Sequence, residues 1–170
     1  MATVREIEQS LFSWAPRESA MDWDNVGHLV GDPEREVERI VVALDITERV
    51  VQEAIDCGAQ LIVSHHPVMN VRWHEREMQT LRPDTRLGGV LTTLVKNDIS
   101  AICMHTNLDA ADGGVNDCLA HALGLSGLSM LNEEKIGRIG TLSCEIPLEE
   151  FLPAVVKSLG CSGLRFRDGG

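Results

Sequence analysis

Three short apolar segments, each followed at once by polar side chains, constrain the fold of this chain more than any other feature. Residues 40–44, 61–63 and 99–104 are rich in isoleucine, valine and other apolar residues, as is typical of strands buried on both faces of a sheet. The segments between them have the apolar spacing of helices. Because strand, helix and strand in this order favour parallel pairing with a right-handed crossover, we predict an α/β fold.

Signals for the ends of helices define the remaining elements. Thr3 and Glu6 form a capping box ahead of a helix that ends near Pro16, and Thr47 and Gly58 mark the start and end of a second helix. The apolar spacing predicts further helices over residues 87–96, 113–123 and 148–159, and further strands over residues 28–30, 128–131, 138–145 and 164–167. The segments 17–33, 70–84 and 105–109 are predicted to be mostly loop.

The balance of charge argues against nucleic acid and anionic membranes as partners. The 170 residues include 15 Lys and Arg against 26 Asp and Glu, which gives a formal net charge of −11. The basic residues form no cluster, so phosphate backbones are repelled. With 44% hydrophobic residues, the composition is that of an ordinary globular protein rather than a disordered one.

The cysteines and the N-terminus indicate a cytoplasmic protein. The five cysteines are odd in number, widely spaced and free of a C-x-x-C pair, which argues against a disulfide framework and a thiolate zinc site. The N-terminus lacks the basic and apolar regions of a signal peptide, and no apolar run reaches the ~20 residues that a membrane span needs.

Two adjacent histidines follow the second apolar strand. His65 and His66 precede Pro67, and an interior imidazole needs partners for both of its nitrogens. Imidazole is also the commonest metal ligand, and neighbouring residues in a kinked loop can serve two ions, or one ion and one supporting group. The alternative is that one ring bonds to a carbonyl group while the other is solvated, and the pair alone leaves both interpretations open.

A second strand end adds an imidazole and a carboxylate, which favours the metal interpretation. His105 and Asp109 follow the strand 99–104, and their mixed nitrogen and oxygen ligands suit zinc, iron or manganese. In open α/β sheets, sites form beyond the carboxyl ends of the strands, so we expect the two histidine-containing loops to face each other. His105 can be a ligand, can orient Asp109, or can be a strand-end histidine bonded to backbone.

Other polar residues have local roles as their simplest interpretation. Asp24 and Asn25 can cap a turn or support the site through hydrogen bonds. Asp45, Asp112, Asn116 and Asp117 are interpreted as turn or helix-start residues, and His28, His74 and His121 as solvated or core histidines. The sequence has no nucleophile elbow, Walker loop or dinucleotide-binding motif. A bound metal is therefore the remaining source of chemistry.

Four motifs stand in order along most of the chain, together with Gly137-Arg138-Ile139-Gly140. They are Asp24-Asn25-Val26-Gly27 with Val30-Gly31-Asp32, Ala43-Leu44-Asp45-Ile46-Thr47, Leu61-Ile62-Val63-Ser64-His65-His66-Pro67, and His105-Thr106-Asn107-Leu108-Asp109-Ala110-Ala111 running on to Gly113-Gly114-Val115-Asn116-Asp117. In this order they resemble the NIF-three-like family, whose members are often labelled GTP cyclohydrolase 1 type 2 homologues. One departure is His28, which stands where an aliphatic residue is more usual.

The resemblance implies a mixed sheet with flanking helices, a ring-shaped homohexamer and a dinuclear metal centre. It implies that His65, His66 and Asp109 are metal ligands, with Asp109 as the bridge between two divalent ions. Three further residues then become candidates that orient or support these ligands: His105, Asp45 and Asn25.

Family members normally complete the site with a histidine and a glutamate in an H-x-x-x-E segment near the C-terminus. No histidine follows His121 in this sequence. Residues 1–170 are therefore interpreted as one NIF-three-like domain that lacks this segment.

The implied chemistry is metal-assisted hydrolysis. Two ions about 3.5–4 Å apart lower the pKa of a bridging water toward ~7 and polarise the substrate. His105 or Asp45 is a candidate proton acceptor. By resemblance the small-molecule substrate is a nucleotide such as GTP, with ring opening as the reaction, although a phosphoester or another small molecule fits the motifs equally. The competing hypothesis is a non-catalytic, ring-forming metal-binding scaffold, metal store or regulatory protein.

Overall fold

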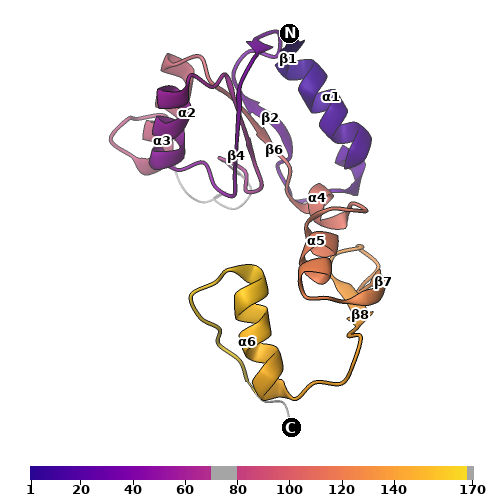
Figure 1. Ribbon diagram of the computed structural model, residues 1–170. Coiled ribbons are helices and arrows are strands. Elements are labelled where there is room, and N and C mark those ends of the chain that lie inside the picture. Colours follow the sequence, from indigo (N-terminus) through magenta and orange to yellow (C-terminus); the bar gives the residue numbers. More distant parts are fainter. Residues whose placement is uncertain (70–79, 168–170) are drawn as a thin grey trace. The chain divides into compact units, whose positions relative to one another are not determined.

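The computed structural model describes residues 1–69 and 80–167, and the chain divides into two compact units (Figure 1). The N-terminal unit is Met1–Ala111 and the C-terminal unit is Asp112–Gly170. Most of the predicted loop 70–84, together with His74, lies outside the described residues.

The N-terminal unit is built on a four-stranded mixed sheet with the order β2-β6-β5-β4. The three predicted strands form its parallel part as β4 (Ile40–Ala43), β5 (Leu61–Ser64) and β6 (Ser100–Cys103). The predicted strand at 28–30 is confirmed as β2 (Gly27–Val30), which pairs antiparallel with β6. The expected α/β fold with a mixed sheet is therefore confirmed.

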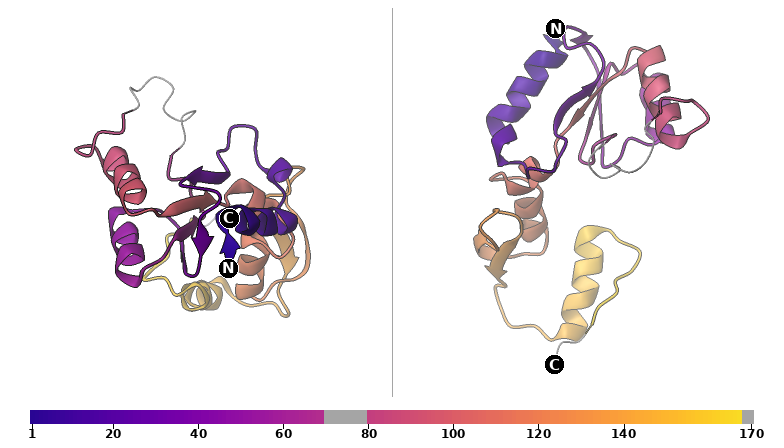
Figure 2. Two further views of the ribbon diagram at one scale, coloured as in Figure 1. Left: turned by 90° about the horizontal axis from the view of Figure 1, so that it is seen from above. Right: turned by 180° about the vertical axis from the view of Figure 1, so that it is seen from behind.

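Helices cover both faces of this sheet (Figures 1 and 2). The helix α1 (Val4–Trp14) packs its apolar side on one face, against a cluster that includes Leu61 and Ile102. The helices α2 (Glu48–Cys57) and α3 (Arg86–Lys96) pack on the other face, around Ile62 and Leu94. All four of these side chains are fully buried, and burial of each contributes about 1.5–3 kcal/mol.

The predicted helix signals operate as expected. The capping box of Thr3 and Glu6 is formed, because the Thr3 hydroxyl accepts from the Glu6 N–H and the Glu6 carboxylate accepts from the Thr3 N–H. Gly58 ends α2 in the left-handed conformation, with φ 70°. At Gly31 the φ of 103° and the approach of Ser100 leave no space for a side chain, since a Cβ would lie 2.2 Å from the Ser100 hydroxyl oxygen.

Several short elements of the N-terminal unit were not predicted. A pair of two-residue strands, β1 (Ala2–Thr3) and β3 (Glu36–Val37), joins the two ends of the first 37 residues, and Arg17–Ser19 forms a turn of 3₁₀ helix. The prediction of loop at 105–109 was wrong, because Thr106–Ala110 forms the short helix α4.

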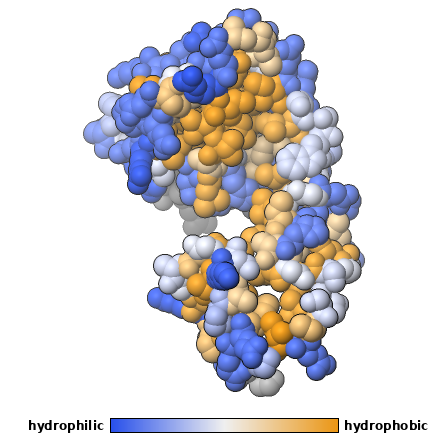
Figure 3. All heavy atoms as spheres, in the orientation of Figure 1, coloured by the Kyte–Doolittle hydropathy of each residue, from blue (hydrophilic) through white to orange (hydrophobic). Residues whose placement is uncertain are grey.

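One edge of the sheet exposes apolar side chains. On β4 and just after it, Ile40, Val42 and Leu44 are 42%, 80% and 61% exposed. Val42 lies opposite Val63 of the neighbouring strand, which packs in the cluster beneath α1. The apolar area on the visible side of this unit is shown in Figure 3. The helix α1 therefore covers only part of its sheet face.

The C-terminal unit contains α5 (Val115–Ala122), a hairpin of β7 (Ser126–Met130) and β8 (Arg138–Thr141), and α6 (Leu148–Leu159). The predicted strand at 138–145 ends earlier, at Thr141. The strand predicted at 164–167 was wrong, because these residues form no element. No helix in the described part of the chain is long and apolar enough to cross a membrane.

Candidate metal centre

Three neighbouring strand ends supply the side chains of the candidate site. Asp45 follows β4, His65 and His66 follow β5, and His105 follows β6. The pairing register places Ala43, Ser64 and Cys103 side by side at the ends of these parallel strands. The residues that follow are therefore delivered to one edge of the sheet, as the sequence predicted.

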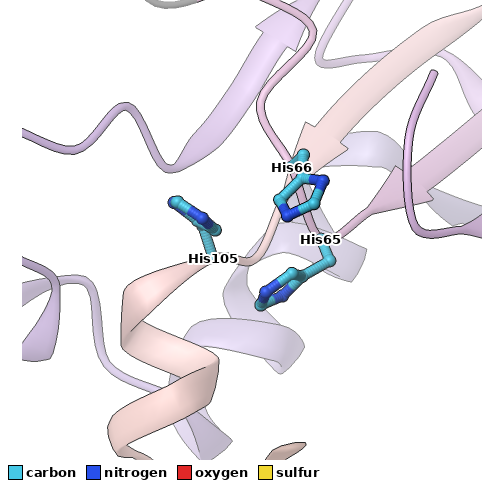
Figure 4. Close-up of side chains that lie close together, drawn as sticks. All are labelled: His65, His66 and His105. Atoms are coloured by element: carbon cyan, nitrogen blue, oxygen red, sulfur yellow. The ribbon is translucent and has the colours of Figure 1, made fainter. Parts of the chain in front are cut away.

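The three imidazoles of His65, His66 and His105 form a compact cluster (Figure 4). One nitrogen of each ring lies within 4.8 Å of the nitrogens of the other two. The ring centroids are 5.1 Å apart for His65 and His66, 5.0 Å for His65 and His105, and 5.5 Å for His66 and His105. The structure thus brings His105 into the same cluster as the predicted pair.

Each ring is oriented by an acceptor at its Nδ1 atom. The Nδ1 of His65 lies 3.0 Å from the Met104 carbonyl oxygen, that of His66 lies 2.8 Å from Asp45 Oδ1, and that of His105 lies 2.9 Å from Asp24 Oδ1. An acceptor at Nδ1 favours the tautomer with the proton there, which leaves the lone pair on Nε2. All three rings are therefore prepared to offer Nε2 to a ligand.

Asp24 is the most deeply buried of these supporting groups. Its side chain is 0% exposed and accepts from the Thr106 N–H at 3.0 Å, the Thr106 hydroxyl and the Asn25 N–H at 2.7 Å, in addition to its contact with His105. Burial by itself raises the pKa of Asp24, but the hydrogen bonds from Thr106, His105 and Asn25 outweigh it and hold the pKa below the usual 3.8. Asp24 is therefore a carboxylate at neutral pH and fixes the His105 ring.

Asp109 lies beside the cluster on α4. Its Oδ1 is 3.7 Å from Nε2 of His65, and both side chains are less than one-fifth exposed. The start of α4 is fixed by Asn107, a fully buried residue whose Oδ1 accepts from the His105 N–H and whose Nδ2 donates to the Ala15 carbonyl group. The carboxylate of Asp109 therefore adds negative charge on the side of His65.

The other candidate residues have definite partners. Asn25 donates its side-chain N–H to the Met69 carbonyl group, so its link to the site is its backbone contact with Asp24. The Nε2 atom of His28 lies 2.7 Å from the Val30 carbonyl oxygen, which agrees with the interpretation of a histidine satisfied by the protein.

Burial, followed by the charge of Asp24, raises the pKa of the Cys103 thiol far above its usual range, so Cys103 is no thiolate at neutral pH.

Sequence reasoning left two features of the site unresolved. Asp24 is 81 residues from His105, and nothing in the local pattern around Asp24 distinguished a ring-orienting carboxylate from a turn cap. Asn107 lies 92 residues from Ala15 in the chain. The sequence indicated the importance of Asp24 and Asn107 only in that both belong to the motifs that carry the family resemblance.

The donor set fits a divalent transition metal. Zinc, iron and manganese all accept imidazole nitrogen together with carboxylate oxygen, and zinc binds imidazole at ~2.0–2.1 Å. The second nitrogen of each metal-binding histidine usually donates to a carboxylate or a carbonyl group, and that is the arrangement of all three rings here. A cluster of solvated histidines that binds no metal would not require these three acceptors.

The fold and this cluster define an α/β protein with a histidine-lined candidate metal centre at the carboxyl edge of its sheet. Comparison with known proteins identifies the family to which this fold belongs. Residues 2–169 match the Duf34/NIF3 (NGG1p interacting factor 3) family, and the chain belongs to this family.

Two curated relatives carry the same name, GTP cyclohydrolase 1 type 2 homolog. The one from Clostridium perfringens is 39% identical over 158 residues, which are 89% of this chain and 58% of the relative. The one from Streptomyces coelicolor is 35% identical over 178 aligned positions, with 96% and 61% covered. This chain is thus a homologue of these proteins and spans about three-fifths of their length.

A solved structure shows the same fold. The crystal structure of a hypothetical protein from Staphylococcus aureus superposes with a TM-score of 0.83 at 27% sequence identity. The match covers 96% of this chain and 66% of the other. The family resemblance and the fold predicted from the motifs are confirmed.

Proposed function

We propose that this chain is the metal-binding part of a divalent-metal-dependent hydrolase that acts on a small molecule. One observation carries the proposal: three imidazoles converge while an acceptor holds the Nδ1 of each. The name of the curated relatives, GTP cyclohydrolase 1 type 2 homolog, supports a nucleotide such as GTP as the substrate, with ring opening as the reaction.

In this proposal His65, His66 and Asp109 bind the ion, and His105 brings a further nitrogen to the same place. Asp109 Oδ1 is near enough to His65 Nε2 for both to contact one ion, at 3.7 Å. When bound, zinc, iron or manganese supplies the Lewis acidity that activates water and polarises a substrate. By resemblance a complete site holds two ions and takes two further ligands from an H-x-x-x-E segment, so we propose that residues 1–170 alone retain no more than one ion after dialysis.

The chain's own groups then orient ligands and move protons. Asp24 keeps the Nδ1 proton of His105 in place, and the Met104 carbonyl group does the same for His65. Asp45, whose side chain is 55% exposed, is the group best placed to exchange a proton with solvent through its contact with His66.

We further propose that the protein works in the cytoplasm.

The test measures metal content and hydrolysis together. The purified chain is loaded with zinc, iron or manganese, analysed for bound metal by mass spectrometry, and assayed on GTP and phosphoesters with and without a chelator. We expect one ion per chain and activity that the chelator removes. Asp109→Ala and His65→Ala should abolish metal binding, whereas His121→Ala, an exposed histidine of the C-terminal unit, should leave it unchanged. If metal binding survives in Asp109→Ala and is lost in His105→Ala, the ligand is His105 and not Asp109.

A second candidate function, a ring-forming metal-binding scaffold, has its own support. The exposed apolar side chains of Ile40 and Val42 on the edge strand β4, and of Leu44 just after it, favour association. We propose self-association into a homohexamer through such surfaces. Light scattering tests it: a monomer at all concentrations contradicts the scaffold, and a metal-loaded oligomer without hydrolytic activity favours it over the enzyme.

A further inference from the structure

An exposed tryptophan stands beside the histidine cluster. The ring centroids of Trp23 and His105 are 6.1 Å apart, with an interplanar angle of 75°, so the two rings meet edge to face. The Trp23 residue is 43% exposed, whereas the His105 side chain is only 12% exposed. The indole therefore presents aromatic surface to solvent directly beside a candidate metal-binding ring.

The backbone around Trp23 is fixed to the same loop that carries His105. The Asp24 N–H donates to the Met21 carbonyl group at 2.9 Å, which closes a turn around Trp23, and the Met21 N–H donates to the Thr106 hydroxyl at 2.9 Å. Asp24 then binds both His105 and Thr106 through its carboxylate. Any large movement of this turn would break the contacts that orient His105, so the backbone that carries the indole is in place before a ligand arrives. The edge-to-face contact with His105 then orients the indole ring.

Isolated exposed apolar residues are common on protein surfaces and need no explanation. Trp23 differs from them because hydrogen bonds of Met21 and Asp24, which flank it in the chain, tie its turn to the loop that carries His105. A large flat side chain held at the border of a polar site is a suitable surface for stacking against a flat ligand. Trp14, at the end of α1 and 51% exposed, provides a tryptophan of similar exposure outside this turn for comparison.

The charges around the cluster indicate which part of a ligand the protein itself recognises. The carboxylates of Asp24, Asp45 and Asp109 surround the three imidazoles, and the whole chain carries a net charge of −11. A bound dication offsets part of this negative charge and can itself take a phosphate oxygen as a ligand, so these carboxylates leave any phosphate to the ion. A neutral aromatic ring needs no cation and gains from contact with the indole.

We propose that Trp23 is the stacking surface for a flat heteroaromatic ring, of the size of a nucleobase, whose polar edge faces the histidine cluster. This inference rests on the proposed function, since it names the class of substrate that the same site accepts. It assigns recognition to the ring rather than to the phosphates.

The test measures binding without turnover. Zinc-loaded protein of 170 residues is titrated with guanosine and adenosine, and in parallel with ribose 5-phosphate and inorganic phosphate, by calorimetry. We expect nucleoside binding to depend on Trp23, and binding of the two phosphate compounds, which contact the ion, to be the same with and without the indole. Trp23→Ala should weaken nucleoside binding about tenfold or more, because stacking of a base on an aromatic side chain has that magnitude. Trp23→Phe should recover most of the affinity, and Trp14→Ala should have no effect.

The controls separate this inference from its premises. Metal content must be the same in Trp23→Ala as in the unmodified chain, which shows that the cluster is intact. Absence of nucleoside binding at millimolar concentration, or equal affinity in the unmodified chain and Trp23→Ala, overturns the inference. Nucleoside binding that depends on Trp23, together with no hydrolysis under any metal, sustains the inference and overturns the hydrolase.

Discussion

The two units of this chain differ in how completely they bury their apolar side chains. The N-terminal unit has two clusters of buried residues, one on each face of its sheet. In the described part of the C-terminal unit, Gly114 and Ala120 are the only buried residues, and α6 has none. The candidate metal centre and its supporting hydrogen bonds all belong to the N-terminal unit.

This difference has a physical reason that bears on function. A metal site needs side chains held to within a fraction of an ångström, and only a packed core supplies that rigidity. The apolar residues Phe151, Leu152, Val155 and Val156 on α6 are partly exposed, so this helix gains little from burial. We therefore expect the two units to differ in stability, in response to metal and in response to pH.

The largest expected effect is a core truncation in the N-terminal unit. Ile62→Ala removes a fully buried side chain of β5 from the cluster that α2 and α3 cover and should lower the free energy of unfolding by about 2–5 kcal/mol. Val156→Ala on α6 should cost under about 1 kcal/mol. All three tryptophans lie within residues 1–111, so tryptophan fluorescence in urea reports on the N-terminal unit while circular dichroism reports on both.

Equal shifts of the two signals in both variants would contradict this prediction. Such a result would show that the two units unfold as one.

Metal binding should stabilise the N-terminal unit alone. An ion that binds only the folded state, at a free concentration of 100 times its dissociation constant, adds about 2.7 kcal/mol. The fluorescence midpoint in urea should therefore rise with zinc. The unfolding transition of the C-terminal unit, which circular dichroism detects and tryptophan fluorescence does not, should keep its midpoint in urea. In His66→Ala the zinc effect should disappear, and a zinc effect that persists there would show that the ion binds elsewhere.

Loss of the buried carboxylate at Asp24 should weaken metal binding without removing a ligand. Asp24→Asn keeps the shape of the side chain but reverses one of its hydrogen bonds to His105 or Thr106. We expect a loss of about 10–100-fold in zinc affinity, measured by competition with a chromogenic chelator. Asp22→Asn, on the same loop, is the matched control. A zinc affinity within twofold of the unmodified chain would mean that His105 is oriented by other contacts or is no ligand.

The smallest expected effect concerns acid and the C-terminal unit. The hydrogen bond from Arg138, followed by that from the Gly113 N–H, holds the pKa of Asp117 below its usual 3.8. A lowered pKa in the folded state stabilises this unit above pH 3.8, and the stabilisation is lost as the pH falls through the lowered value. Circular dichroism during acid titration should therefore show the C-terminal unit losing stability in this range.

Asp117→Asn is the control for this titration. The variant should be less stable at neutral pH and should lack that part of the pH dependence. An unchanged acid profile would assign the loss to other carboxylates.

The local elements were predictable to the extent that local contacts make them. The helix starts at Thr3 and Thr47 and the end of α2 at Gly58 agree with the sequence signals, because capping bonds join residues three or four apart. The strand predicted at 164–167 failed for the opposite reason. A strand exists only when another strand supplies its hydrogen bonds, and alternating apolar residues do not guarantee a partner.

The sequence by itself determined the order of the elements, the parallel part of the sheet and the delivery of histidines to its carboxyl edge. It did so because apolar periodicity and chain connectivity are local properties, and because parallel strands end at the same edge. Only the tertiary structure decided which ring joins His65 and His66, and which groups hold all three. Asp24, which orients the His105 ring, lies in the loop before β2 and is 81 residues from His105 in the chain. The two side chains are close because β2 pairs with β6. Such long-range contacts depend on the order of strands in the finished sheet, which no single segment of the chain specifies.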